Sequence, residues 1–215
     1  MNKLVIAAAL ALIGAVPSGA PAAPSASDVL ARMTADRASL NTFKVRVGFE
    51  IDLRAFLHLH FSPKATYYFK RPDKSELVFD SLPPAAQQFQ HFYGSLGTPE
   101  TWPATYDISL TSASADAGGH PLYQLKLVPK NNGGSLDYVQ MSVDARDYGV
   151  VQEEWFYKSG ATIIMQQSNE RLGKFVLPKQ QIADFNFPSY KAHAVSTYDG
   201  YHLNVDVPDS VFTNS

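Results

Sequence analysis

The sequence has 215 residues, 18 basic and 20 acidic side chains, and no cysteine. It has no basic block, which argues against a nucleic-acid surface. Without cysteine it can form no disulfide, thiol nucleophile or thioether-linked lipid anchor. At the start, Lys3 precedes an apolar run from Leu4 to Val16, and Ala20-Pro21-Ala22 supplies small residues before a cleavage point. This layout predicts a secretory signal peptide over residues 1–22 and a periplasmic protein. A retained membrane anchor is the alternative, although a membrane span needs about 20 apolar residues.

The mature chain opens with a predicted helix and a long strand. Ser25 or Ser27 is a suitable N-cap for a helix that runs to about Leu40. From Phe43 to Leu53, apolar residues alternate with mostly charged ones, which is the pattern of a half-buried antiparallel strand. A helix would scatter these apolar residues around its whole circumference. They are Phe43, Val45, Val47, Phe49, Ile51 and Leu53.

Shorter strand-like segments follow in series. We expect strands at 57–61, 66–71, 76–80, 106–111, 123–128, 136–143, 150–157 and 162–168, with breaks at 112–121, 170–173, Pro178 and Pro188. This spacing predicts one large antiparallel sheet, strongly curved or nearly closed, in a single domain over residues 23–215. One stretch differs, because Pro83 and Pro84 can open a short helix from Ala85 to Gly94. Its aromatic face carries Phe89, Phe92 and Tyr93.

Signals for catalysis are weak. The sequence has no Gly-x-Ser-x-Gly elbow and no glycine-rich phosphate loop after a strand, so we expect neither an enzyme nor a cofactor. Glu153 and Glu154 are adjacent but point to opposite faces of a strand. His58 and His60 share a face and could bind a metal, yet no ligand-rich partner segment accompanies them. We expect them to face solvent, with a secreted enzyme or metal protein centred on them as a third reading.

The segment from Tyr67 to Leu77 resembles the LolA-like lipoprotein carriers. There too, an aromatic strand runs into Lys-Arg-Pro, which is Lys70-Arg71-Pro72 here, and a second strand follows. The helix leading into the first strand, Leu127-Val128-Pro129-Lys130 before a loop, and the C-terminal stretch 201–212 also resemble the family. The resemblance implies a mainly β fold: an incomplete, half-open antiparallel β-barrel with an N-terminal helix and a short lid helix over an apolar cavity. It also implies a carrier of acyl chains between an inner-membrane donor and an outer-membrane acceptor, with transient membrane contact only.

The resemblance also implies roles for individual residues. The matching arginine of the family reaches the lid and helps to latch the cavity, which assigns that role to Arg71. The expected lipid-binding residues are the six apolar residues of 43–53 together with Tyr67, Phe69, Leu77, Phe79, Phe89, Phe92 and Tyr93. One departure is the helix 85–94, because the carriers have a further strand pair there, so the cargo could be a free phospholipid, a hopanoid-like lipid or a glycolipid. Two alternatives remain open: the row 43–53 packs simply as core, or the fold serves an envelope sensor or assembly module that binds protein partners.

Overall fold

The computed structural model describes residues 24–81, 96–116 and 118–212. Its first element is helix α1 (Ala26–Arg37), which confirms the predicted N-terminal helix. Ser25 is the N-cap: its Oγ accepts a hydrogen bond from the Asp28 amide at 3.2 Å, and Asp28 Oδ2 accepts one from the Ser25 amide at 2.8 Å. This reciprocal capping box satisfies two amides that the helix leaves without partners. The predicted signal peptide and the predicted helix 85–94 lie outside the described residues.

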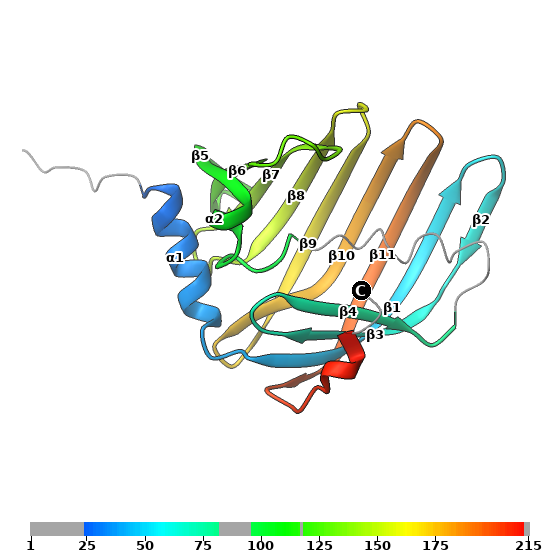
Figure 1. Cartoon of the computed structure of the whole chain (residues 1–215), viewed down its shortest axis with the longest axis horizontal. Helices are drawn as coiled ribbons and strands as arrows, with labels where there is room; N and C mark the ends of the chain where they lie inside the picture. Colours follow the sequence, from blue (N-terminus) through cyan, green and yellow to red (C-terminus); the bar gives the residue numbers. More distant parts are fainter. Residues whose placement is uncertain (1–23, 82–95, 117, 213–215) are drawn as a thin grey trace, which may run out of the picture.

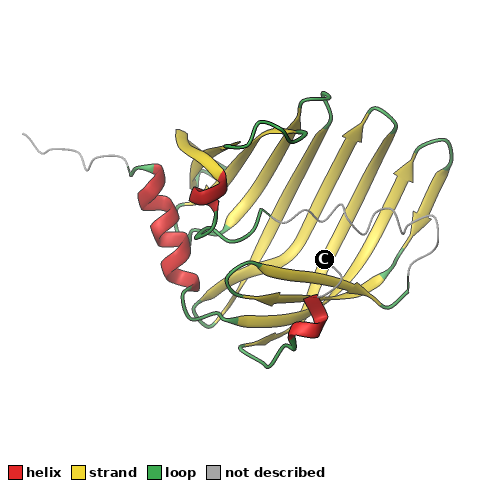
Figure 2. Cartoon of the chain, in the orientation of Figure 1, coloured by secondary structure: helices red, strands yellow, loops and turns green. Residues whose placement is uncertain are grey.

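The described ranges form one antiparallel sheet of eleven strands (Figures 1 and 2). The strands are β1 (Thr42–Arg54), β2 (His58–Phe61), β3 (Lys64–Lys70), β4 (Lys74–Phe79), β5 (Tyr106–Ala115), β6 (Pro121–Pro129), β7 (Leu136–Asp144), β8 (Val150–Tyr157), β9 (Thr162–Leu172), β10 (Phe175–Phe187) and β11 (Tyr190–Leu203). Their order is β4-β3-β1-β11-β10-β9-β8-β7-β6-β5, with β2 also beside β1. Two short helices, α2 (Trp102–Thr105) and the 3-10 helix η2 (Asp209–Phe212), complete the fold. The sheet does not close, which confirms the predicted mainly β, half-open architecture.

Strand β1 organises one half of the sheet. It pairs with β11 on one side, and on the other with β3 along its first half and β2 along its second. Its inward residues Phe43, Val45, Val47, Phe49 and Leu53 are buried, which confirms the half-buried strand read from their alternation. Ile51, in the same row, is only partly buried.

Three predicted strand breaks are wrong in extent. Strand β5 continues to Ala115, because a register shift between Leu110 and Ser112 keeps it paired with β6. Strand β9 continues to Leu172, and the turn is made by Gly173 at φ 63°, a conformation that glycine adopts without strain. Pro178 lies within β10, where a β-bulge between Pro178 and Gln180 accommodates the residue that lacks an amide hydrogen. The break predicted at Pro188 is confirmed, because β10 ends at Phe187.

Two hydrophobic clusters make up the interior. The α1 cluster packs one face of α1 onto β6 and β7 and consists of Val29, Leu30, Met33, Trp102, Leu125, Leu127, Val139, Met141 and Val143. The β1 cluster joins β1, β3 and β10 and consists of Leu40, Phe43, Val45, Val47, Phe49, Ala65, Phe175 and Leu177. Within the described residues, no helix has both the length and the apolar character to cross a membrane.

Candidate functional site

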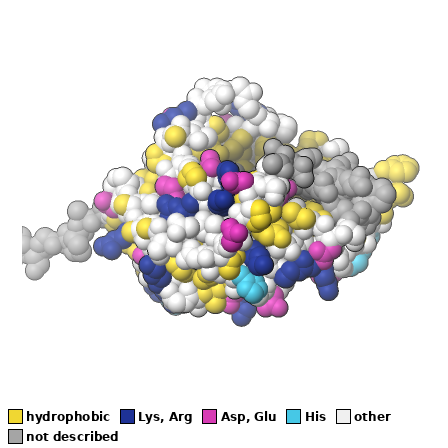
Figure 3. All heavy atoms as spheres, turned by 60° about the horizontal axis from the view of Figure 1, so that its bottom comes forward, with side chains coloured by type: hydrophobic (Ala, Val, Ile, Leu, Met, Phe, Trp, Pro, Cys, Tyr) yellow, Lys and Arg dark blue, Asp and Glu magenta, His cyan; other side chains and the backbone are white. Residues whose placement is uncertain are grey.

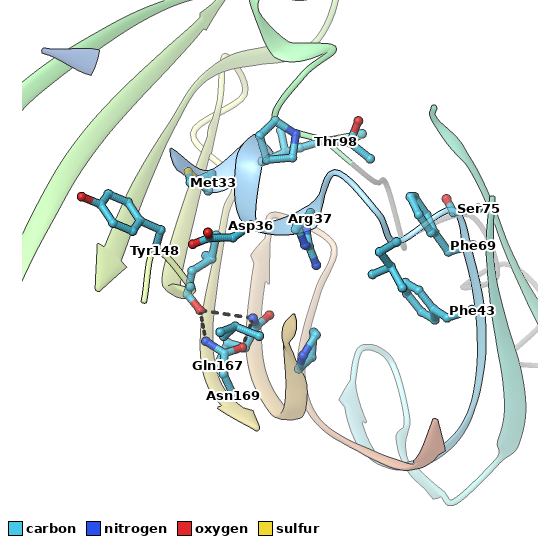
Figure 4. Close-up of a pocket in the computed structure, with 18 of the residues that line it drawn as sticks. Met33, Asp36, Arg37, Phe43, Phe69, Ser75, Thr98, Tyr148, Gln167 and Asn169 are labelled. Carbon is cyan, nitrogen blue, oxygen red and sulfur yellow. Dashed lines mark hydrogen bonds between the residues drawn. The ribbon is translucent and has the colours of Figure 1, made fainter. Parts of the chain in front are cut away.

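A cavity of about 250 Å³ lies between the α1 cluster and the β1 cluster. It is lined from α1, from β1, β3 and β4, from the segment 96–102, and from β8 to β11 (Figure 4). The lining strands are consecutive in the sheet order, from β4 to β8, and they surround the cavity because the sheet curls. This partly open cavity, with apolar and polar side chains on different walls, is the candidate site.

The apolar wall of the cavity comes from β1, β3 and β4. Phe43 stacks on Phe69 with ring centroids 5.1 Å apart and tilts against Tyr67 at 5.7 Å. In the register of these strands, Phe43 lies opposite Phe69 and Tyr67 lies opposite Leu77. The aromatic wall is therefore fixed by strand pairing, and it presents a preformed apolar surface to a ligand.

The predicted lipid-binding residues fall into three groups. Phe43, Tyr67, Phe69 and Leu77 line the cavity, as does Arg71. Val45, Val47 and Phe49 belong to the β1 cluster, Ile51 and Phe79 pack against it, and Leu53 is buried farther along β1; none of these six lines the cavity. Phe89, Phe92 and Tyr93 lie outside the described residues. Within the row 43–53, only its first residue therefore reaches the cavity.

The opposite wall is polar. Tyr198 Oη donates to Gln181, Gln181 Nε2 donates to Gln167 Oε1 at 2.6 Å, and Gln167 Nε2 donates to Asn169 Oδ1 at 2.6 Å. Asn169 Nδ2 then donates to the Val150 carbonyl at 2.8 Å. We did not anticipate this chain of amides, although the two-residue spacing of Gln167 and Asn169 places them on one face of a strand. It leaves the cavity amphiphilic rather than purely apolar.

Arg71 joins three parts of the cavity rim. Its Nη1 donates to the Arg37 carbonyl at the end of α1 at 3.1 Å, and its Nη2 lies 2.6 Å from Glu100 Oε1. The backbone amide of Arg71 donates to the Asn41 carbonyl at 2.8 Å. The Arg71 and Glu100 side chains are only 25% and 19% exposed, so solvent screens the pair weakly. A cation beside the last carbonyls of a helix is also favoured by the helix dipole.

Glu153 places a titratable carboxyl in the cavity wall. Burial raises its pKa to about 7, and the hydrogen bond donated by Trp155 Nε1 at 3.0 Å opposes that rise only in part. Glu154, on the opposite face, accepts a hydrogen bond from Gln152 Nε2 at 2.6 Å. The two adjacent carboxylates are therefore separated by the sheet, as the sequence predicts.

His58 and His60 lie on the outer face and are exposed, as expected. His60 Nδ1 is 3.2 Å from Asp52 Oδ1, and this contact lowers the pKa of Asp52. Over the ranges that the structure describes, no group of three or more His, Asp and Glu side chains is arranged to hold a metal ion. On the face seen in Figure 3, basic and acidic side chains are interspersed with apolar ones.

Three solved structures share this fold. A LolA superfamily protein from Nitrosomonas europaea matches with a TM-score of 0.64 at 15% identity, over 89% of this chain and 98% of that one. A domain from Vibrio parahaemolyticus described as an outer membrane lipoprotein-sorting protein domain gives 0.63 at 10% identity, over 88% and 97%. A DUF1329 family protein from Desulfovibrio piger gives 0.64 at 16% identity, over 86% and 94%. No protein-family model and no curated protein matches the sequence.

The chain therefore has the LolA-like fold. This confirms the predicted resemblance at the level of the fold. At such low identity the likeness concerns the course of the backbone and does not extend to individual side chains. What the cavity binds has to be argued from its own residues.

Proposed function

We propose that this protein is a periplasmic carrier that binds lipid, or the acyl chains of lipoproteins, in its cavity and moves them toward the outer membrane. The observation that carries the proposal is the cavity itself: a preformed aromatic wall inside a half-open sheet of LolA-like fold. Each methylene group taken from water into such a site contributes about 0.8 kcal/mol. An acyl chain is therefore a ligand that this wall can hold without a cofactor or a reaction.

The size of the cavity bears on how cargo enters. Its volume of about 250 Å³ lies below the range of roughly 300–1,000 Å³ of typical ligand pockets. A lipoprotein anchor with several acyl chains would require the cavity to widen. Widening means moving the β3–β4 turn away from α1 and from the segment 96–102, and Arg71 bridges these parts. We propose that Arg71 acts as the latch, with the predicted aromatic residues Phe89, Phe92 and Tyr93 as part of the lid.

The periplasmic location and the membrane contact rest on two further features. The location follows from the predicted signal peptide, and N-terminal sequencing of the exported protein should show cleavage between Ala22 and Ala23. At the β1–β2 turn, Phe56 and Leu57 are 99% and 61% exposed. An apolar pair at the tip of a hairpin is suited to brief insertion into a lipid surface, as loading and unloading require.

The test is native mass spectrometry, with solvent extraction, of protein purified from a bacterial periplasm without detergent. We expect a bound species of lipid mass. Leu77→Trp fills the cavity and should abolish that species, whereas Val78→Trp, on the exposed outer face of the same strand, should retain it. A clean apo mass that persists after incubation with lipids and a lipoprotein would contradict the carrier function. A protein co-purifying in place of lipid would instead favour the sensor or assembly module.

A further inference from the structure

Arg37, the last residue of α1, presents a cation to the cavity. In Figure 4 its side chain lies in the hollow, with Phe43 and Phe69 on one side and Gln167 and Asn169 on the other. The apolar wall and the polar wall thus meet around one guanidinium. We did not anticipate this role, because an arginine in the last turn of a helix is common for reasons of helix stability alone.

The Arg37 guanidinium has no partner among residues 24–81, 96–116 and 118–212. No carboxylate there lies within 4.0 Å of it, and its side chain donates no hydrogen bond to them. Other arginines behave differently: Arg46 pairs with Asp80, Arg146 with Asp144, and Arg71 with Glu100. Arg37 takes part in the Arg71 contact only through its backbone carbonyl.

The acidic residues that line the cavity compensate the charge of Arg37 only in part. Glu100 is engaged by Arg71, and burial raises the pKa of Glu153 to about 7, so that carboxyl is largely neutral in mildly acidic solution. Asp147 accepts a hydrogen bond from the Gly149 amide, and Asp36 and Asp73 are exposed. None of these carboxylates lies within 4.0 Å of the Arg37 guanidinium.

The surroundings of the Arg37 guanidinium destabilise its positive charge. Burial lowers the pKa of Arg37, and the Arg71 charge lowers it further, while Tyr67, Glu100 and Tyr201 counteract this only in part. A guanidinium does not lose its proton in a protein, so the cost remains as an unpaired charge in poorly solvated surroundings. An anion entering the cavity would relieve that cost.

We infer that Arg37 binds the anionic group of the cargo, a carboxylate or a phosphate ester, while the acyl chain lies on the wall of Phe43, Phe69 and Leu77. This inference rests on the proposed carrier function and narrows it to anionic amphiphiles. A guanidinium offers two parallel donors to either kind of oxyanion. The neighbouring amides of Gln167 and Asn169 can hydrogen-bond to the ester or hydroxyl groups of the same ligand.

The test is isothermal titration calorimetry in mildly acidic solution, where Glu153 is largely protonated, with three probes of equal chain length: palmitate, palmitoyl lysophosphatidylglycerol and hexadecanol. The wild-type protein should bind at least one of the two anions about tenfold more tightly than the neutral alcohol, as a charged hydrogen bond allows. Arg37→Met should remove that preference and leave hexadecanol binding unchanged. Arg37→Lys, which keeps the charge, should retain part of it. Arg32→Gln removes an exposed cation from the same helix and should change nothing.

The outcomes separate this inference from the proposed function. Preference for palmitate alone or for the lysophospholipid alone supports the inference and tells which oxyanion the site takes. Equal binding of all three probes by the wild-type protein, or an unchanged preference in folded Arg37→Met, overturns the role of Arg37 and leaves the carrier function standing. If no probe binds to the wild-type protein, the carrier function fails as well. Circular dichroism verifies that each variant is folded.

Discussion

The two hydrophobic clusters lie on the same sheet but differ in how closely their side chains are packed. In the α1 cluster, Leu125, Leu127, Val139, Met141 and Val143 are completely buried beneath a helix face that matches them. In the β1 cluster, aromatic rings stack along β1 and β3, and beside them lies a cavity whose far wall is a chain of side-chain amides. The α1 cluster is therefore closely packed, whereas the β1 cluster borders a cavity.

The difference shows how a half-open sheet can be both stable and hollow. Close packing of aliphatic side chains supplies stability in proportion to the area buried, and any void there costs free energy. A helix with a matching apolar face fills the first cluster. In the second, large rings held in register by strand pairing tolerate an adjacent space, because their support comes from the backbone ladder as well as from neighbouring side chains.

The largest effect that we expect comes from truncating a leucine of the α1 cluster, compared with a leucine that packs against the β1 cluster and lines the cavity. Leu127→Ala opens a void in the filled cluster and should lower the free energy of unfolding by about 2–5 kcal/mol. Leu77→Ala only enlarges an existing cavity and should cost less than about 2 kcal/mol. Urea unfolding measures both. Lipid retention should respond in the opposite order, with Leu77→Ala the more damaging. Equal losses of stability in the two variants would contradict the distinction between a closely packed cluster and a cavity wall.

The second prediction concerns the pH dependence of stability through Glu153. Because burial raises its pKa from 4.5 to about 7, the folded state favours the protonated form. The stability that this gives is complete below pH 4.5 and is lost as the pH rises through about 7. Glu153→Gln keeps an acceptor for Trp155 and removes the titration, so the variant should gain up to about 3 kcal/mol over the wild type above the raised pKa and little in acid. Parallel pH profiles for both proteins would show the wild-type decline, and its persistence in the variant would assign it to another group.

The sequence predicts much of the fold because local patterns carry it. Alternation in 43–53 and the turn residues between later segments indicate the strands, and Ser25 or Ser27 as N-cap indicates the start of α1. The end of β9 and the continuation of β10 through Pro178 are less predictable, since cross-strand pairing extends strands through residues that are poor strand formers on their own.

The cavity is much harder to predict than the sheet. The alternation from Phe43 to Leu53 marks one buried face but does not distinguish the first residue, which meets the cavity, from Val47 and Phe49, which meet the core. That distinction depends on where the sheet curls and on what α1 covers. The polar wall cannot be predicted from the sequence for the same reason. Glutamines in a strand are typical of surface positions, and only the curvature of the sheet places these side chains in the cavity wall.

The third prediction concerns Arg71, which connects the β3–β4 turn to α1 and to the segment 96–102. Arg71→Leu removes the contacts to the Arg37 carbonyl and to Glu100, and should lower the free energy of unfolding by about 1–3 kcal/mol. Transfer of bound lipid to acceptor vesicles should become faster as the rim loosens. Lys70→Leu is the matched control, because it removes a neighbouring cation that pairs with the exposed Asp209. If Arg71→Leu leaves both lipid retention and transfer unchanged, Arg71 is not a latch.

The smallest effect on stability, and the sharpest separation of folding from function, is expected at the β1–β2 turn. Phe56→Ser should leave the free energy of unfolding unchanged, because the ring is 99% exposed and supports neither cluster. Burying a phenylalanine in an apolar phase contributes about 1.5–3 kcal/mol. If Phe56 enters the membrane, its loss should therefore weaken vesicle binding by about ten- to a hundredfold in a sedimentation assay. Ile164→Ser, an exposed apolar residue on β9, is the control. Equal weakening by both variants would mean that the protein adheres through general surface hydrophobicity, and the turn would then have no special part in loading or unloading.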